Sequence, residues 1–225
     1  MINTHYWKQM KSLNPHTCPS VQFFRFLGYS GIELSNKNIL EIGFGGNNGM
    51  DLLEFQKRGA TVYGTEINQY YIDEFHKNNP KIPILFMNAG TDELPFRINF
   101  DLIYHLDVIY YLSDEEIDFH FNSVYQNLMN GGHFAFQFIE CDLFFENSIH
   151  QNESLKFDFD LMKSAKSNVF FRGETNPFRK LDIDNLCKIA YNIGFKLLGT
   201  KTLLESYTPD ETVYRLNRYL LFTKQ

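Results

Sequence analysis

Two carboxylates and a pair of closely spaced glycines form the most chemically informative pattern in this sequence. One apolar run of residues ends at Glu41, and Gly43 and Gly45 follow at alternate positions. A second apolar run ends at Glu66. This order predicts a strand, a glycine-rich turn, a helix and a second strand, with both carboxylates at the carboxyl edge of a parallel sheet. That edge is where such sheets bind ligands that contain adenosine.

The charge and the spacing of these residues favour a cationic nucleoside over a dinucleotide. The dinucleotide fingerprint G-x-G-x-x-G requires a glycine where this sequence has Asn48. Glu41 would repel a pyrophosphate at the N-terminus of the following helix, whereas it would attract an ammonium or a sulfonium group. Glu66 can accept two hydrogen bonds from a ribose diol.

Four motifs in the expected order resemble those of the class I S-adenosylmethionine (SAM)-dependent methyltransferases. Residues 41–45, Glu-x-Gly-x-Gly, are similar to the first motif of that family, and Glu66 resembles its acidic ribose binder. Residues 100–103 resemble its fourth-strand motif, and residues 128–134 are similar to the L-x-x-G-G turn before its fifth strand. The resemblance implies methyl transfer with S-adenosyl-L-methionine as the cofactor.

The resemblance also implies a fold and a set of cofactor-binding residues. The expected fold is an α/β, doubly wound, mostly parallel seven-stranded sheet (Rossmann-like) with N-terminal helices and an inserted cap segment. Two positions depart from the family pattern. The usual third glycine is Asn47, which tolerates a left-handed backbone better than most residues, and the carboxylate that often follows the third strand is Asn88. The implied cofactor-binding residues are Glu41, Gly43, Gly45, Gly46, Asn47, Glu66, Ile67, Asn88, Ala89, His105 and Leu106.

The loop after the fourth strand is where catalytic residues are expected. Methyl transfer requires alignment of the acceptor with the methyl group, and a general base helps when the acceptor is a hydroxyl or a protonated amine. His105 is the candidate base, because the reference pKa of histidine lies near physiological pH. Asp107 could orient His105, act as the base itself or bind the acceptor. The alternative is that His105 contacts the cofactor only through its backbone and that Asp107 caps the next turn.

Several residues outside the cofactor motifs are candidates for binding the acceptor. Aromatic residues near the N-terminus could form a lid, a loop bounded by prolines could form a gate, and arginines in the insertion could clamp an anionic acceptor. Helix packing and a solvated surface are the alternatives. The candidate acceptor-binding residues are Tyr6, Trp7, Thr17, Tyr110, Tyr111, Arg172 and Arg179.

Regular secondary structure must position these residues. Strands are expected at 38–43, 60–66, 82–87, 100–106 and 133–139, followed by an antiparallel pair at 195–204 and 212–223. Helices are expected at 3–12, 20–28, 50–58, 114–129 and 182–193. Ser113 and Glu116 predict a capping box at the start of the fourth of these helices, and Gly194 predicts the end of the last one.

The length suits a single methyltransferase domain over residues 1–225. Residues 1–36 are expected to form a helical lid. Residues 141–180 form an insertion whose many phenylalanines favour an ordered cap over the substrate.

The composition restricts the partners and the location. A net charge of −6 and a pI of about 5.6 argue against broad binding to nucleic acid or to an anionic membrane. Widely spaced cysteines indicate reduced thiols and no metal site, so we expect a cytoplasmic protein. We also expect a monomer or homodimer. The expected acceptor is a small molecule, most plausibly a hydroxyl of a sugar, a glycan precursor or a secondary metabolite. The alternatives are methyl transfer to RNA or protein, and a non-catalytic SAM-binding protein.

Overall fold

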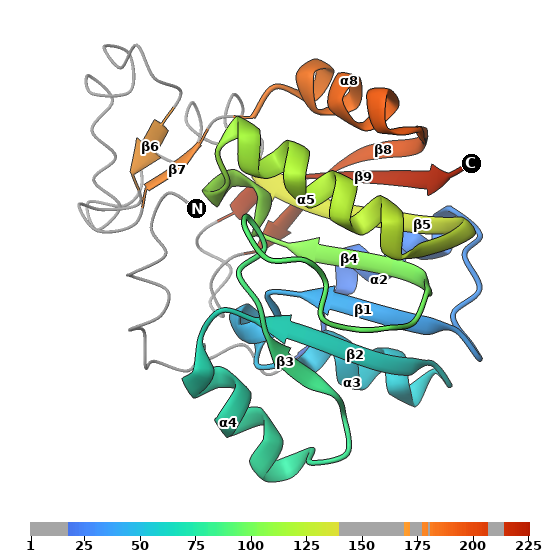
Figure 1. The fold of residues 1–225 in the computed structure, drawn as a ribbon, viewed down its shortest axis with the longest axis vertical. Helices are drawn as coiled ribbons and strands as arrows, with labels where there is room; N and C mark the ends of the chain where they lie inside the picture. The colour runs from blue at the N-terminus through green and yellow to red at the C-terminus, as the bar shows by residue number, and fades with distance from the viewer. Residues whose placement is uncertain (1–17, 140–168, 172–176, 180, 207–213) are drawn as a thin grey trace.

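A computed structural model describes residues 18–139, 169–171, 177–179, 181–206 and 214–225. These residues contain one seven-stranded sheet in the order β3-β2-β1-β4-β5-β9-β8 (Figure 1). Its strands are β1 (Asn38–Ile42), β2 (Thr61–Glu66), β3 (Ile84–Phe86), β4 (Phe100–Leu106), β5 (Leu128–Ile139), β8 (Phe195–Ser206) and β9 (Tyr214–Lys224).

The strand order reverses between β1 and β4, with β2 and β3 on one side and β5, β9 and β8 on the other. Strands β1 to β5 run parallel to one another, and β9 is antiparallel to both β5 and β8. The prediction of a mostly parallel sheet that ends in an antiparallel pair is therefore confirmed. Ligands of such sheets bind where the order reverses, beyond the carboxyl ends of the strands.

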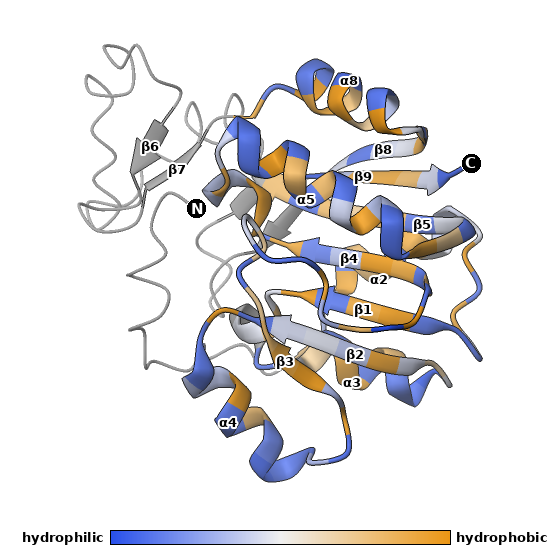
Figure 2. Cartoon of the chain, viewed as in Figure 1, coloured by the Kyte–Doolittle hydropathy of each residue, from blue (hydrophilic) through white to orange (hydrophobic). Residues whose placement is uncertain are grey.

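Helices cover both faces of this sheet (Figure 1). On one face lie α5 (Asp114–Asn127) and α8 (Ile183–Ile193), and on the other lie α2 (Val21–Tyr29), α3 (Met50–Lys57) and α4 (Gln69–Asn78). Two short 3-10 helices, η1 (Phe44–Asn47) and η2 (Ile109–Tyr111), follow β1 and β4. Hydrophilic and hydrophobic positions alternate along α5 and α8, as expected for helices with one buried face (Figure 2).

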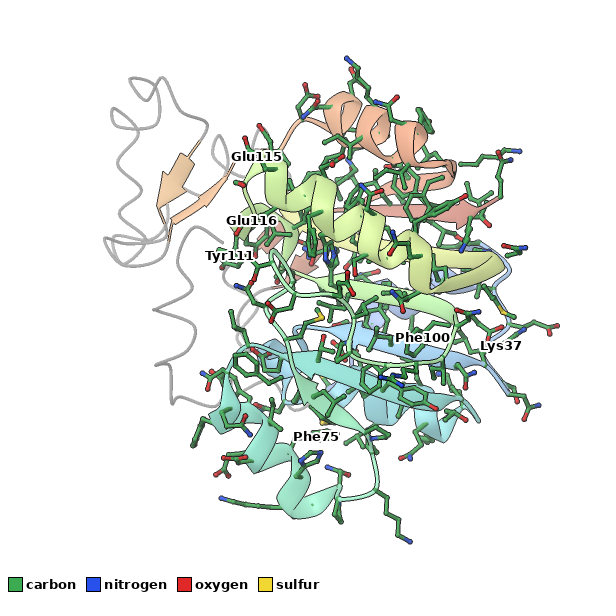
Figure 3. All side chains as sticks on the ribbon, viewed as in Figure 1. Lys37, Phe75, Phe100, Tyr111, Glu115 and Glu116 are labelled. Carbon is green, nitrogen blue, oxygen red and sulfur yellow. The ribbon has the colours of Figure 1, made fainter. Side chains whose placement is uncertain are left out.

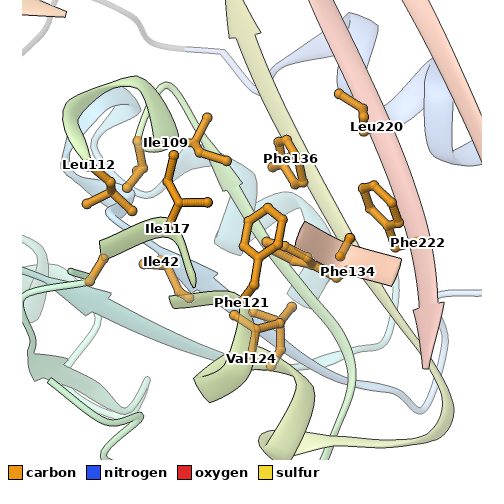
Figure 4. Close-up of a cluster of buried hydrophobic side chains, with 14 of the residues drawn as sticks. Ile42, Ile109, Leu112, Ile117, Phe121, Val124, Phe134, Phe136, Leu220 and Phe222 are labelled. Carbon is orange, nitrogen blue, oxygen red and sulfur yellow. The ribbon is translucent and has the colours of Figure 1, made fainter. Parts of the chain in front are cut away.

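The core on the α5 face is largely aromatic. The ring of Phe121 lies 5.2 Å from that of Phe134 and 5.5 Å from that of Phe136 (Figure 4). The predicted capping box begins this helix, since Ser113 Oγ accepts from the Glu116 amide and the Glu116 carboxylate accepts from the Ser113 amide. The aromatic contacts thus pack α5 against β5, and the capping box defines where the helix begins.

One strand begins well before its predicted start, and one helix was not predicted. Strand β5 already begins at Leu128, which pairs with Phe100, and the pairing then shifts so that Leu102 pairs with His133. The glycine turn predicted to precede the strand is therefore an irregularity within it, with Gly131 at a φ of 76°. Helix α4 was not predicted, although Asn68 caps it by accepting a hydrogen bond from the Tyr70 amide.

A separate two-stranded antiparallel sheet comes from the insertion. It consists of β6 (Val169–Phe171) and β7 (Pro177–Arg179), and β7 lies against η2 at the carboxyl edge of the main sheet. The helix predicted at 3–12 and most of the segment 141–180 lie outside the described residues. Within the ranges that the structure describes, no helix is long and apolar enough to cross a membrane.

Replacing Phe121 by alanine should destabilise the protein by about 3–5 kcal/mol, because the cavity would open between α5 and the sheet. Urea unfolding measures this change. Asp118 lies on the exposed side of the same helix, so Asp118→Ala should change stability by about 0.5 kcal/mol or less. Equal effects of the two substitutions would show that α5 does not pack on the sheet as described.

Candidate cofactor site

The turn between β1 and α3 has a backbone that few sequences can adopt. Gly43 has a φ of 76° and donates its amide to the Thr65 carbonyl at 2.7 Å. After η1, Asn48 and Gly49 are both left-handed, with φ of 58° and 73°. The left-handed asparagine is thus Asn48, whereas Asn47, which was expected to take this conformation, belongs to η1. Asparagine tolerates that region, so the turn forms without a third glycine at position 47.

The carboxylate of Glu66 lies directly beside this turn and is 6 % exposed. One oxygen accepts from the Gly45 amide at 2.9 Å, and the other accepts from the amides of Ile67 and Asn68 at 2.8 and 3.0 Å. A methyl group on Gly45 would lie 2.6 Å from the Tyr71 ring and 2.8 Å from Glu66 Oε2. Only glycine therefore allows this approach of β2 to the turn.

Glu41 is the second buried carboxylate of the edge, at 3 % exposure. It accepts a hydrogen bond from the Tyr104 hydroxyl at 2.8 Å. Burial, followed by the nearby charge of Asp51, raises the pKa of Glu41 well above its usual value, while the Tyr104 hydrogen bond lowers it. Burial likewise raises the pKa of Glu66, against the effect of its amide donors.

These two acids fit a cationic ligand. Among the residues that the structure describes, no lysine or arginine forms an ion pair with Glu41 or Glu66. A buried carboxylate without a cation is costly, and an ammonium or sulfonium group would offset that cost. The carboxylates at this edge thus suit the cationic SAM and would disfavour a pyrophosphate.

The loop after β3 lies next to Glu66. The Met87 amide donates to the Glu66 carbonyl at 2.9 Å, so Asn88 and Ala89 emerge at the same edge. Helix α5 holds this loop through His120 Nδ1, which lies 3.1 Å from the Ala89 carbonyl, and through Ser123 Oγ, which accepts from the Leu94 amide at 3.3 Å.

The loop after β4 does not present His105 to the edge. Its ring is fully buried on the α5 face, 5.3 Å from the Phe136 ring and 5.2 Å from the His120 ring. Burial, followed by the neighbouring His120, lowers the pKa of His105 well below its usual value. A neutral ring in this position has no exposed surface for an acceptor, which favours the alternative that His105 serves the site through its backbone.

Asp107 is placed differently from His105. It is half-buried at the end of β4 with a φ of 59°, and its amide lies 3.2 Å from Gln137 Oε1. The left-handed backbone fixes this residue where the chain leaves the sheet. Asp107 is therefore the better placed of the two catalytic candidates.

Of the candidate acceptor-binding residues, Tyr110 and Tyr111 are buried in η2, and Arg179 ends β7 beside it. Figure 3 shows Tyr111 near Glu116 at the start of α5, at the edge opposite Lys37. The remaining candidates, Tyr6, Trp7, Thr17 and Arg172, lie outside the described residues.

Sequence reasoning missed Tyr104 and Asp51. Tyr104 pairs in register with Glu41 across β1 and β4, so its hydroxyl reaches the carboxylate. Asp51, fully buried on α3, accepts from the amide and hydroxyl of Ser20 and thereby ties α2 to the turn. The sequence did contain a signal for Tyr104. Successive side chains of a strand point to opposite faces of the sheet, so Tyr104 and His105 in β4 were expected on opposite faces.

Two other features bear on the location of the site. A cleft of 330 Å³ lies at the amino edge of the sheet, between the loop 30–37 and the turn 129–133. Neither Glu41 and Glu66 nor the turn at residues 43–49 lines this cleft, so we place the site at the carboxyl edge. In the described part of the chain, no cluster of His, Cys, Asp or Glu could hold a metal ion.

Replacing Glu41 by glutamine should stabilise the cofactor-free protein at neutral pH. A raised carboxyl pKa contributes stability below the unfolded value, close to 4.5, and this stability is lost as the pH rises through the folded pKa. The glutamine amide cannot ionise, so Glu41→Gln should raise Tm by several degrees at neutral pH and leave it unchanged in acid. A gain of about 1 kcal/mol in the free energy of unfolding corresponds to a rise in Tm of roughly 2–4 °C for a domain of this size.

Thermal unfolding across pH measures this effect, and Glu33→Gln, at an exposed carboxylate, is the matched control. Identical pH profiles for Glu41→Gln and the wild type would mean that Glu41 ionises as readily as an exposed acid.

The similarity of this chain to known proteins is consistent with a SAM site at the carboxyl edge. Residues 40–136 match the family of methyltransferase domains, a range that includes the glycine turn, Glu66 and β4. No curated protein is similar enough to count as a relative.

Solved structures share the fold at low sequence identity. A SAM-dependent methyltransferase from Mesorhizobium loti is 16% identical, with 89% of this chain and 97% of that chain covered and a TM-score of 0.63. A putative SAM-dependent methyltransferase from Listeria monocytogenes is 16% identical, with 92% of this chain and 99% of that chain covered and a TM-score of 0.64. Magnesium protoporphyrin IX methyltransferase from Synechocystis with bound SAH is 13% identical, with 91% of this chain and 81% of that chain covered and a TM-score of 0.62. The family match over residues 40–136, the shared fold and the paired acids together support a class I SAM-dependent methyltransferase that uses S-adenosyl-L-methionine as its cofactor.

Proposed function

We propose that this enzyme methylates a hydroxyl of a small molecule, of the class of a sugar, a glycan precursor or a secondary metabolite. The observation that supports this proposal most is the position of β7, which lies against η2 beside the buried Tyr110 and Tyr111. A strand from the insertion thus lies at the edge where the acceptor must bind. An acceptor site bordered in this way suits a small molecule.

The cofactor residues take the following roles in this proposal. Gly43, Gly45, Gly46 and Asn47 supply the backbone turn, and Glu41 faces the cationic end of the ligand. Glu66 and Ile67 hold the ribose, Asn88 and Ala89 contact adenine, and the backbone of His105 and Leu106 borders the sulfur. When bound, SAM supplies an electrophilic methyl group; the protein residues align the acceptor and exclude water.

The ribose contact requires an adjustment at Glu66. A carboxylate has about four acceptor positions, and three are already used by the amides of Gly45, Ile67 and Asn68. A ribose diol that donates both hydroxyls must share or replace one of these amides. We expect the ribose to share or replace the hydrogen bond from the Gly45 amide, because the turn that carries this amide also borders the ligand.

Asp107 is the residue that we propose to receive or orient the acceptor proton. Its half-buried carboxyl group follows β4, and Gln137 fixes its backbone. A carboxylate in this position can hydrogen-bond to a hydroxyl and withdraw its proton as the methyl group is transferred.

An RNA acceptor, a protein acceptor and a non-catalytic SAM-binding protein are the alternatives, and experiment can distinguish them from the proposed function. A net charge of −6 disfavours RNA as the acceptor, although a protein acceptor is compatible with it. A non-catalytic SAM-binding protein would show no turnover with any acceptor. A metabolite screen with labelled methyl donor, run beside RNA and total protein, decides between them; labelling of RNA or protein alone would contradict the proposal. The cytoplasmic location and the oligomeric state stay predictions.

Gly45→Val and Glu66→Ala should both weaken SAM binding. The valine side chain would displace Tyr71 and the Glu66 carboxylate, and affinity should collapse. Loss of the Glu66 carboxylate should cost about 1–3 kcal/mol of binding free energy. Isothermal calorimetry gives both values. Gly28→Ala is the matched control, because a methyl group at Gly28 meets open space. Unchanged affinity in both site variants would place the cofactor elsewhere.

Asp107→Asn should lower turnover by about 10²-fold or more at unchanged SAM affinity, since an amide cannot take up the proton. Asparagine keeps the left-handed backbone, so the position of the loop is retained. Steady-state kinetics with an acceptor from the screen measures this. His105→Ala is the comparison: a larger loss of turnover there than in Asp107→Asn would restore His105 as the base.

A further inference from the structure

Two buried carboxamides at the carboxyl edge have side-chain atoms without hydrogen-bond partners. Gln137 on β5 is 1 % exposed, and Asn217 on β9 is fully buried. Within the described ranges, Gln137 Nε2 and both polar atoms of the Asn217 side chain are without a partner. An unpaired buried amide costs about 1–3 kcal/mol, so native proteins rarely keep one without a reason.

The sheet register brings these two side chains together. Gln137 pairs with Tyr219 across the antiparallel β5–β9 ladder, and Asn217 is two residues from Tyr219. Side chains two residues apart on a strand point to the same face. Gln137 and Asn217 are therefore diagonal neighbours on one face, and such residues lie roughly 7–8 Å apart, with their Cβ atoms somewhat closer.

This face also carries the buried acid of the cofactor site. Tyr219 and Tyr104 both belong to the core under α2, and the Tyr104 hydroxyl donates to Glu41. Gln137 pairs with Leu106 at the end of β4, and its Oε1 accepts from the Asp107 amide. A polar row thus crosses the edge from Glu41 on β1 to Asn217 on β9.

The two ends of this row differ in charge. The end at β1 holds carboxylates, which suit the cationic cofactor. The end at β5 and β9 holds neutral amides with free donors and, on Asn217, a free acceptor. A hydroxyl group both donates and accepts, so it can satisfy a carboxamide that an apolar acceptor would leave unpaired. Bulk water does not reach these atoms, so their partner must be an enclosed one.

We propose that Gln137 and Asn217 bind hydroxyl groups of a neutral, polyhydroxylated acceptor next to Asp107. This inference rests on the proposed function and narrows its acceptor class. The hydroxyl to be methylated lies toward Asp107, and the carboxamides hold other hydroxyls of the same molecule. Both residues are acceptor-binding, with no role in holding SAM.

The first test needs no acceptor. Asn217→Leu replaces an unpaired amide by an apolar group of similar size, so this variant should raise Tm of the cofactor-free protein. Asn68 is the matched control: it is 1 % exposed, but its side chain accepts from the Tyr70 amide. Asn68→Leu should therefore lower Tm. A fall in Tm for Asn217→Leu as large as that for Asn68→Leu would overturn the inference, because Asn217 would then be satisfied within the protein.

The second test uses binding and turnover. SAM affinity should be the same in Asn217→Leu and in the wild type. Neutral monosaccharides and their glycosides, screened with labelled methyl donor beside their phosphorylated forms, should include the better substrates. With the best neutral substrate, KM should rise by about tenfold in Asn217→Leu, the effect of one lost hydrogen bond.

The outcomes separate the two proposals. Methylation of phosphorylated sugars alone, or an unchanged KM in Asn217→Leu, would overturn the assignment of these carboxamides. Absence of turnover with every small molecule would instead overturn the proposed function, and the Tm comparison would still decide whether Asn217 is unsatisfied.

Discussion

Three backbone amides converge on the buried carboxylate of Glu66, and the geometry of the cofactor edge depends on this convergence. The amides of Gly45, Ile67 and Asn68 join the turn after β1 to the turn after β2. Hydrogen bonds to a charged group are strong, and a low local dielectric makes them stronger. Glycine is required at position 45 because any Cβ would collide with the carboxylate. The binding turn is therefore organised before a ligand arrives.

The alternation of β4 divides the chemistry between the two faces of the sheet. Tyr104 points to the α2 face and donates to Glu41, whereas His105 points to the α5 face and packs against Phe136 and His120. His120 in turn lies against the Ala89 carbonyl, and burial lowers the pKa of His120 to about 4. The histidines thus form a neutral support under the loop after β3, while the acids lie on the opposite face.

The polar row under α2 weakens the folded state and prepares it for ligands. Glu41 is buried without a cation among the described residues, and the side chain of Asn217 is buried there without any partner. Such groups destabilise the empty protein, yet they become satisfied when a complementary ligand binds. Their order along the edge, acids at β1 and amides at β9, is the basis of our proposal that a neutral acceptor binds beside the cationic cofactor.

The sequence by itself determined the strands that frame the site, the acids Glu41 and Glu66, and the capping box at Ser113, because apolar runs, glycine turns and caps are local signals. It also contained the cap of α4 at Asn68, which was overlooked. Only the tertiary structure decided that Tyr104 reaches Glu41 and that His105 is buried. Tyr104 and Glu41 are 63 residues apart, and their contact depends on the register between β1 and β4. The hydrophobic alternation of a strand fixes the face that each residue takes, whereas only the pairing of β1 with β4 in the folded sheet places Tyr104 opposite Glu41.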